Sequence, residues 1–434
     1  MFNEQPGETS GHGLGWIWQI IIIFVLFMLV AQWVVPLFNI AGRDLTISDA
    51  LAYLGGQGYA VYADPSGTFY TNDILPNADS SYDVGATGSE YAEGHFDAVY
   101  APTGRTATLV VAASDASALS KAQADYVVVG TADDEINAAI AALPPPGGII
   151  HLTEGLFSIS ASINLNRTAV LEGSGMGYSS PSYAGTRISL ANGANVPMIV
   201  LDATGLEQII CAEVRSLCLN GNKANQGVAT PSLWLKNNLA DCLFTDLFFV
   251  SCKGNPIEIS DGWLHRFTRI WAENYDGIGV HIQETGAFWS GSLSFTDSRI
   301  SGGVNAVKIE DGCGAGGAAD PWDSCFTGCI FSGAQQHGVI LDSAPGWTFN
   351  GCTFRAASQS VANTYDDINI DDDGFDPTVN VAISGSIIDG VSQSRYGVTI
   401  DGLSNYICVM GNVIVNHATG TVNVVGAANA NGRI

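Results

Sequence analysis

The sequence predicts an all-β fold, a right-handed parallel β-helix in which short strands wind into a stack of coils. Three observations support this prediction. Apolar residues make up 47% of the 434 positions and charged residues only 13%, which excludes disorder as the main state. The 51 glycines, together with abundant Ser, Thr, Asn and Val, indicate strands joined by many tight turns. A short motif also returns along the chain, as the period of a solenoid requires.

The recurring motif is an apolar residue, then usually a small polar residue, then usually Gly or Asp. Its apolar positions are Phe244, Phe267, Phe295, Phe326, Phe349, Ile383 and Val409. A second strand position recurs between them, at Leu233, Ile257, Val280, Val307, Val339, Ile368, Val398 and Val422. The shortest coils, from Phe244 to Phe267 and from Phe326 to Phe349, are 23 residues long. Residues beyond this length in the other coils are therefore expected to form loops.

The third position of the motif is expected to be a bend between two strands. Glycine occupies it in the later coils, at Gly328, Gly351, Gly385 and Gly411, where we expect a Cβ atom to be unwelcome. Asp246 and Asp297 occupy the same position, and because Asp tolerates turn geometry we favour them as turn formers over catalytic acids. The next residues should stack as an internal ladder of Ser298, Cys329, Cys352, Ser386 and Asn412.

An amphipathic helix is expected just before the first coil, within a capping region at 124–148. Thr131 followed by Asp134 is a variant of the capping box that begins a helix. The apolar face of this helix carries Ile136, Ile140 and Leu143, and a run of prolines then stops it. Such a helix is expected to cover the open end of the solenoid core at 149–434.

The sequence of the capping helix and the first strand resembles the start of the pectate-lyase-like superfamily of right-handed parallel β-helices. So do the stretches LEGSGMG at 171–177 and VRSLCLNGNKANQG at 214–227. The resemblance covers about residues 124–425. It implies a protein like the trimeric virus spikes that bind or cleave surface polysaccharides. The superfamily's catalytic signatures are missing. Its hydrolases carry Gly-His-Gly and Asp-Asp on a strand, but here His337-Gly338 lacks the preceding Gly and Asp366-Asp367 lies near a loop. Its lyases use Arg or Lys, and basic residues are scarce in this chain. Its catalytic residues therefore cannot be transferred to this chain.

The N-terminal part divides into four expected segments. A polar tail at 1–13 precedes an apolar stretch at 14–40, which has no charged residue and is long enough to span a bilayer as a helix. The alternative for this stretch is a trimeric stem that buries its apolar surface against its own copies. A linker with a short helix follows at 41–67. Residues 68–123 contain a stretch that resembles a connector module of viral fibres and spikes, carried by Tyr82, Val84, Gly85, Phe96 and Tyr100.

The net charge and the number of cysteines limit the classes of partner and the cysteine roles that can be expected. A net charge of -26 argues against nucleic acid, because little in the chain could neutralise phosphates. The charge suits a protein that stays soluble outside the cell or in high salt, although a generic acidic surface accounts for it as well. The nine cysteines are an odd number, so they cannot all pair within one chain. We favour structural thiols over disulfide or metal roles.

Surplus residues gather at one corner of the predicted coil, in loops at about 281–292, 309–324 and 369–380, and a fourth loop at about 355–366 leaves another corner. Because coils stack, the loops at one corner should form a rim rich in carboxylates and aromatic rings. Rings stack on sugar faces and paired carboxylates cleave glycosidic bonds. The catalytic candidates are Asp320, Asp323 and Glu310, and the glycan-binding candidates are Trp289, Trp322, Phe375 and Glu284. The alternative is a solvated acidic edge on which the Trp residues pack the loops.

Calcium is the one cofactor that the sequence suggests. In the stretch DINIDDDG, Asp367, Asn369 and Asp371 alternate as in a calcium loop. The glycine comes too late and no terminal Glu follows, so the stretch departs from the EF-hand pattern.

These features favour a homotrimeric viral spike or receptor-binding protein. It would be anchored in a virion or membrane and would present the β-helix to host surface glycans. One alternative is a membrane-tethered polysaccharide hydrolase or lyase. Another is a cell-surface adhesion protein without a viral origin.

Overall fold

The computed structural model describes residues 62–63, 69–70, 107–145, 147–176, 185–206, 208–283, 290–310, 324–372, 377–425 and 431–434. The chain divides into two units, 1–101 and 102–434, and each is considered by itself. In the first unit, β1 (Tyr62–Ala63) pairs antiparallel with β2 (Phe69–Tyr70). The predicted apolar segment at 14–40 and the residues that carry the fibre-module resemblance lie outside the described residues. Within the described ranges, no helix has the length and apolar character needed to cross a bilayer.

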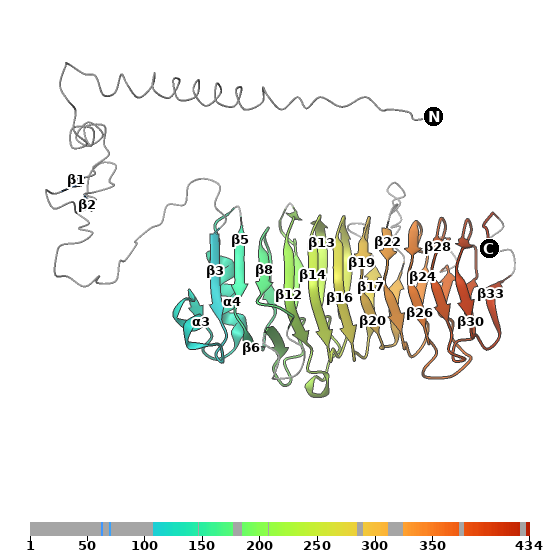
Figure 1. The fold of residues 1–434 in the computed structure, drawn as a ribbon, viewed down its shortest axis with the longest axis horizontal. Helices are drawn as coiled ribbons and strands as arrows, with labels where there is room; N and C mark the ends of the chain where they lie inside the picture. The colour runs from blue at the N-terminus through green and yellow to red at the C-terminus, as the bar shows by residue number, and fades with distance from the viewer. Residues whose placement is uncertain are drawn as a thin grey trace, which may run out of the picture. The chain divides into compact units, whose positions relative to one another are not determined.

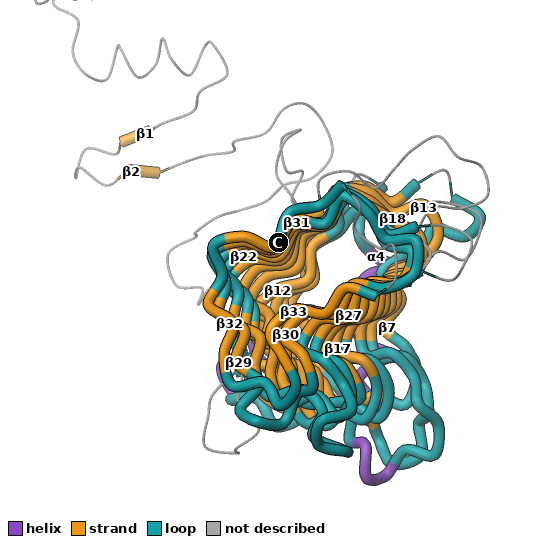
Figure 2. The backbone as a smooth tube through the Cα atoms, turned by 90° about the vertical axis from the view of Figure 1, so that its right-hand side faces the viewer, coloured by secondary structure: helices purple, strands orange, loops and turns teal. Residues whose placement is uncertain are grey.

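The second unit is a parallel β-helix (Figure 1), whose all-β architecture is consistent with the predicted right-handed winding. Its strands stack into three sheets, seen nearly end-on in Figure 2. Sheet 1 contains β7 (Ile163–Asn164), β10 (Ile199–Asp202), β13 (Leu233–Ala240), β15 (Ile257–Trp263), β17 (Ile278–Gln283), β21 (Asn305–Ile309), β24 (Val339–Asp342), β27 (Ile368–Asp371), β30 (Tyr396–Ile400) and β33 (Gly420–Val424). The short strands β11 (Ile209–Ile210) and β18 (Ser290–Gly291) extend it beside β13 and β15.

Sheets 2 and 3 are joined by three long strands that run through the bend between them: β12 (Glu213–Asn220), β14 (Leu243–Val250) and β16 (Arg266–Glu273). The rest of sheet 2 is β3 (Ala107–Ala112), β5 (Gly148–Leu152), β8 (Val170–Gly173), β19 (Ser294–Thr296), β22 (Ser324–Thr327), β25 (Trp347–Asn350), β28 (Ala382–Ser384) and β31 (Cys408–Met410). The rest of sheet 3 is β6 (Gly155–Ile159), β9 (Thr186–Leu190), β20 (Arg299–Ser301), β23 (Ile330–Ser332), β26 (Thr353–Arg355), β29 (Ile387–Asp389) and β32 (Val413–Val415).

The coil register predicted from the sequence is confirmed. Each motif residue from Phe244 to Val409 pairs with the next one in the predicted order along sheet 2. Each second-strand position from Leu233 to Val422 likewise pairs with its predicted successor in sheet 1. The repeat therefore reports which residues occupy equivalent places in successive coils.

The bend between sheets 2 and 3 lies at the predicted position, but for a different reason from the one expected. The residues there have left-handed φ angles, including 62° at Gly351, 67° at Gly411, 55° at Asp246 and 49° at Asp297. A Cβ atom added to Gly351 or Gly411 would meet no atom within 4 Å, so crowding does not select glycine. The left-handed backbone does, because glycine adopts it freely and Asp tolerates it. The interpretation of both aspartates as turn formers agrees with this backbone.

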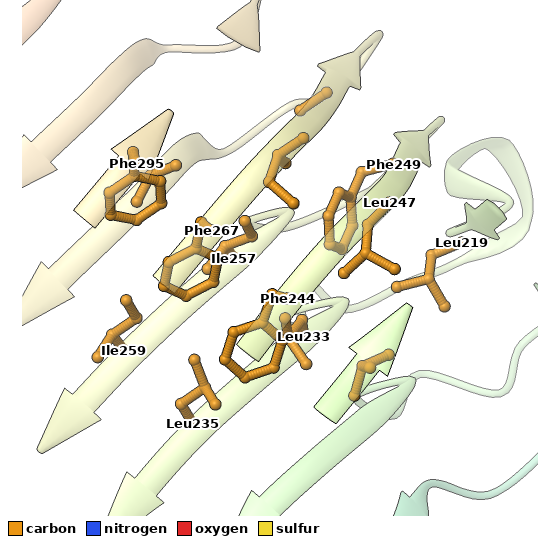
Figure 3. Packing of buried hydrophobic residues seen from close by; sticks show 14 of the residues in the cluster. Leu219, Leu233, Leu235, Phe244, Leu247, Phe249, Ile257, Ile259, Phe267 and Phe295 are labelled. Atoms are coloured by element: carbon orange, nitrogen blue, oxygen red, sulfur yellow. The ribbon is translucent and has the colours of Figure 1, made fainter. Parts of the chain in front are cut away.

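The interior of the solenoid contains a continuous column of phenylalanine rings. Phe244, Phe267 and Phe295 stack with centroids 4.6 and 4.3 Å apart and face Leu233, Leu235, Ile257 and Ile259 (Figure 3). The column continues to Phe326 and Phe349 with spacings of 4.6 and 5.2 Å. All of these rings are buried in a single apolar cluster. Because each coil adds a ring against its neighbours, adjacent coils are held in register by packing.

The polar ladder beside this column also forms. Ser298, Cys329, Cys352 and Ser386 are buried, and each hydrogen bonds to the backbone of the preceding coil. Ser386 Oγ accepts from the Cys352 amide at 3.1 Å, and Asn412 Oδ1 accepts from the Ser386 amide at 2.9 Å. The eight cysteines in the described ranges are free thiols, in agreement with a structural role. Burial raises the pKa of Cys242 to about 12, which makes its thiol unreactive.

The first coil begins earlier than expected. β3 lies inside the range predicted for the connector, yet it pairs in parallel with β5, Ala107 opposite Gly148. After β3 come α3 (Ala118–Ala122), β4 (Tyr126–Val127) and α4 (Ala132–Ala142). In chain order α4 stands where later coils have a strand of sheet 1. A short 3₁₀ helix, η1 (Lys223–Asn225), interrupts a later loop.

The helix α4 presents the predicted apolar face, with Ile136, Ile140 and Leu143 buried in the core. It packs against β3, β5, β6 and β7. The predicted capping box is wrong, because Thr131 makes no side-chain hydrogen bond to the helix amides. The first turn instead contains three acidic residues, Asp133, Asp134 and Glu135. Their negative charges stabilise the helix by interacting with the positive N-terminal end of its dipole.

Candidate functional site

The three loops predicted to share a corner all begin at a strand of sheet 1, at the ends of β17, β21 and β27. The second and third loops are followed by β22 and β28 of sheet 2, whereas the first is followed by β18, which extends sheet 1 beside β15. Glu310 lies at the start of the second loop and is half-buried. The other predicted catalytic and glycan-binding residues lie outside the described residues: Asp320, Asp323, Glu284, Trp289, Trp322 and Phe375.

Beside Glu310, the outer surface of sheet 1 carries a column of aromatic and ionisable side chains that sequence reasoning missed. Trp234, Glu258, His281 and Lys308 are neighbours in four adjacent parallel strands. Each directly follows a second-strand position of the repeat, and because side chains alternate along a strand, each points outward where its predecessor points inward. The repeat therefore contained a signal for this column, namely the residue after each register position.

His281 links two carboxylates. Its Nε2 lies 3.0 Å from Glu310 Oε2, and its Nδ1 lies 3.7 Å from Glu258 Oε2. Lys308 forms an ion pair with the other oxygen of Glu310. The exposed side-chain fractions of His281 and Glu258 are only 12% and 14%, while that of Glu310 is 31%. We call Glu258, His281, Lys308 and Glu310 the histidine–glutamate cluster.

Glu258 is held as a carboxylate by its neighbours. Asn255 Nδ2 donates to Oε2 at 2.7 Å, and Gln283 Nε2 donates to Oε1 at 2.8 Å. Burial raises the pKa of Glu258, but the nearby His281 and the hydrogen bonds from Asn255 and Gln283 outweigh it, so the pKa lies below its ordinary value. Glu258 therefore stays ionised near neutral pH.

An aromatic ring lies beside this carboxylate. Trp234 is half-buried, and its Nε1 donates to Ser260 Oγ at 3.2 Å. The Lys236 ammonium lies 4.6 Å from the centre of the same ring. These contacts fix the orientation of the indole. The arrangement combines an oriented ring, a fixed carboxylate, and a histidine that can exchange a proton with a second, more exposed carboxylate.

One of the predicted calcium residues, Asp367, is engaged in other contacts. Asp367 is buried, and its carboxylate is occupied by His417 Nε2 at 2.7 Å, Ser394 Oγ at 2.9 Å and the Ala357 amide at 3.1 Å. Asn369 and Asp371 lie further along β27, and Asp371 Oδ1 accepts from the next amide. Burial raises the pKa of Asp371. Across the described part of the chain, no group of three or more His, Cys, Asp or Glu residues is placed to hold a metal ion.

Asp366 and His337, which stand near the missing superfamily signatures, are also engaged in structural contacts. Arg395 donates two hydrogen bonds to the buried Asp366 carboxylate, at 3.0 and 2.8 Å. His337 Nδ1 accepts from the Asp366 amide at 3.1 Å. Burial lowers the pKa of His337, which keeps this ring neutral. Both residues tie adjacent coils together.

Comparison with known proteins agrees on the fold. No protein-family model matches the sequence, and no curated protein matches it. Among solved structures, ORF18 of Geobacillus virus E2 is similar with a TM-score of 0.52 and 15% identity over 69% of this chain. The alignment spans 59% of that viral protein, less than two thirds of its length. The similarity shows a shared parallel β-helix fold.

Two further structures give lower scores. The A-module of mannuronan C-5 epimerase AlgE4 from Azotobacter vinelandii has a TM-score of 0.42 and 16% identity, covering 69% of this chain and 96% of the module. DFA-IIIase from Arthrobacter chlorophenolicus, solved in complex with GF2, has a TM-score of 0.40 and 14% identity, covering 68% of this chain and 80% of that enzyme.

Proposed function

We propose that this chain is a spike-type β-helix protein that binds host surface polysaccharide along the outside of sheet 1. The observation that carries the proposal is the outer column in which Trp234 stands beside the histidine–glutamate cluster. An oriented indole can stack on a sugar face, and fixed carboxylate and amide groups can accept and donate hydrogen bonds to hydroxyls. The long loops that leave the same corner would extend this surface, with Trp289, Trp322, Phe375 and Glu284 as further contacts.

The similarity to a viral protein supports the proposal that this chain is part of a virion. The proposal also includes a homotrimer that is anchored through residues 14–40. Such a trimer would present three copies of the surface, so that weak individual contacts add as avidity. Mass measurement of the folded protein as a monomer would contradict the trimer without touching the glycan site.

Cleavage of the polysaccharide is the second candidate, and it rests on the pairing of Glu258 and Glu310 through His281. Glu258 is the ionised member, which suits a base or a nucleophile. Glu310 is the more exposed member and shares a hydrogen bond with a histidine, which suits proton transfer. Asp320 and Asp323 of the neighbouring loop are further candidates for the acid.

One experiment tests both candidates. Purified full-length protein is screened against surface polysaccharides for binding and for release of new reducing ends. We expect Trp234→Ala and Glu258→Gln each to weaken binding by about tenfold, which corresponds to about 1.4 kcal/mol. If the chain is an enzyme, Glu310→Gln, Asp320→Ala or Asp323→Ala should abolish product release while binding survives.

The matched control is Ser384→Ala, which removes an outward polar group from sheet 2 and should leave both readouts unchanged. Equal binding by the wild type and by Trp234→Ala and Glu258→Gln would contradict the placement of the site on sheet 1.

A further inference from the structure

A second constellation of reactive side chains lies on the outside of sheet 2, in the first coils. His151 belongs to β5 and Glu172 to β8, and the two residues are direct neighbours across the parallel strands. Ser174 follows the end of β8 and is exposed. None of these residues contributes to the histidine–glutamate cluster, which lies on sheet 1 in later coils.

The three side chains form a connected series. Ser174 Oγ lies 3.3 Å from His151 Nε2, and His151 Nδ1 lies 3.0 Å from Glu172 Oε1. When Nδ1 carries the proton and donates to Glu172, the lone pair of Nε2 faces the serine hydroxyl. This is the arrangement of a hydroxyl nucleophile, a general base and a carboxylate that orients the base.

The carboxylate is fixed in its ionised form. Arg215 Nε and Nη2 donate to Glu172 Oε2 at 2.9 and 2.5 Å, and Arg215 Nη1 donates to Glu213 at 2.9 Å. Burial raises the pKa of Glu172, but the hydrogen bonds from Arg215 and His151 outweigh it, so the pKa lies below its ordinary value. An ionised Glu172 holds the Nδ1 proton and stabilises the imidazolium that forms when His151 accepts a second proton.

The backbone around Ser174 is also fixed. Gly175 has a φ of +133°, and a Cβ atom on Gly173 would lie 2.5 Å from the Ser216 carbonyl oxygen, so both flanking positions require glycine. The Ser174 amide donates to Thr186 Oγ1 at 2.7 Å, and the Gly175 amide donates to Ser216 O at 3.1 Å. These contacts hold an exposed serine on a sharp turn at the end of a strand.

The side chains of this series are accessible to solvent. The exposed side-chain fractions of His151 and Glu172 are 33% and 22%, in contrast to the buried Asp367–His417 pair. Ser174 Oγ also lies 3.1 Å from the Leu152 carbonyl, so its single proton has two acceptors at rest. Rotation of the hydroxyl proton from Leu152 O to His151 Nε2 would activate the nucleophile.

We propose that Ser174, His151 and Glu172 form a serine hydrolase site for small carboxylic esters. Ser174 Oγ attacks the ester carbonyl carbon while His151 Nε2 takes the hydroxyl proton, and the carbonyl π pair moves onto its oxygen. Collapse of this intermediate breaks the bond to the alcohol, which leaves with the proton from His151. Water then attacks the acyl-serine with His151 again as base, which releases the carboxylic acid and restores Ser174. The net reaction is ester plus water to acid plus alcohol.

The test uses the full chain with p-nitrophenyl acetate as substrate and a fluorophosphonate as covalent probe, located by peptide mass spectrometry. We expect the wild type to hydrolyse the ester and to carry the label on Ser174. Ser174→Ala should lose the label and lower kcat/KM by about 100-fold or more, and His151→Ala should do the same. Glu172→Gln should lower kcat more than it changes KM, because it acts through His151.

The matched control is Ser189→Ala, another outward serine of the first coils, which should keep full hydrolysis and labelling. Because Ser174 is exposed, its alanine variant should unfold at the same temperature as the wild type. The proposal is overturned if the wild type neither hydrolyses the ester nor takes the label. It is also overturned if Ser174→Ala hydrolyses the ester as fast as the wild type. Glycan binding on sheet 1 is not read out here, so the two proposals fail independently.

Discussion

The inward-facing and outward-facing residues of the same strands differ in whether similar residue types repeat from coil to coil. In β15, Ile257 and Ile259 point inward and pair with equivalent apolar residues of the next coil. Between them Glu258 points outward, and its neighbours in the column are a tryptophan and a histidine. The interior repeats because every coil must bury the same space against the next one. The exterior has no such constraint, so it can carry chemistry that differs at every coil.

A second comparison refines the first, between two histidine–carboxylate pairs. His417 and Asp367 lie 2.7 Å apart and are each only 1% exposed, and they connect residues 50 positions apart in sequence. His281 and Glu310 lie 3.0 Å apart but keep 12% and 31% of their side chains exposed. The chemical groups are the same, yet only the second pair can meet a ligand. Burial therefore separates a pair closed off from solvent from one that a ligand can reach.

The largest effect should come from opening the phenylalanine column. Phe295→Ala removes a buried ring that stacks on Phe267 and Phe326. We expect a loss of about 3–5 kcal/mol in the free energy of unfolding, from lost burial and the cavity left behind. Urea unfolding followed by circular dichroism measures it.

The control lies on the same strand. Thr296→Ala changes the next residue, which points outward, and should alter the unfolding free energy by less than about 0.5 kcal/mol. Equal destabilisation by the two variants would mean that the inside and outside of β19 do not differ as described.

A smaller but still large effect is expected from the buried contact between Asp367 and His417. Asp367→Ala leaves His417 and Ser394 without their shared acceptor inside the structure. Breaking a buried pair from one side costs about 3 kcal/mol. Thermal and urea unfolding measure this cost, with Asp297→Asn as the control, because Asp297 is an exposed bend residue whose left-handed φ asparagine also tolerates. If Asp367→Ala lowered the free energy of unfolding no more than the control does, Asp367 would behave as a solvated acid. It would then again be a candidate calcium ligand.

These differences explain how much could be predicted from the sequence. The coil register was predicted residue by residue, because Phe244, Phe267 and Phe295 recur under a packing constraint that leaves a period in the sequence. Glu310 was identified because it begins a long loop. Glu258 and His281 were missed because outward positions carry no period of their own, and the link from His151 to Ser174 depends on pairing between coils. The contact between Asp367 and His417 could not be predicted, because spacing within one stretch of sequence does not reveal a partner two coils away.

The smallest effect is expected from the titration of Glu258, and it separates the partly exposed histidine–glutamate cluster from the buried Asp367–His417 pair. Because its pKa is lowered in the folded protein, ionised Glu258 stabilises the fold fully above the ordinary carboxyl value of 4.5. This contribution is lost as the pH falls below that value through the folded pKa. The titratable group of the cluster that faces Glu258 is His281, whose Nδ1 lies 3.7 Å from Glu258 Oε2. Urea unfolding of the wild type and Glu258→Gln at a series of pH values should give a difference in unfolding free energy that shrinks below pH 4.5. A difference that stays constant as the pH falls would mean that the hydrogen bonds from Asn255 and Gln283, rather than the charge, hold this side chain in place.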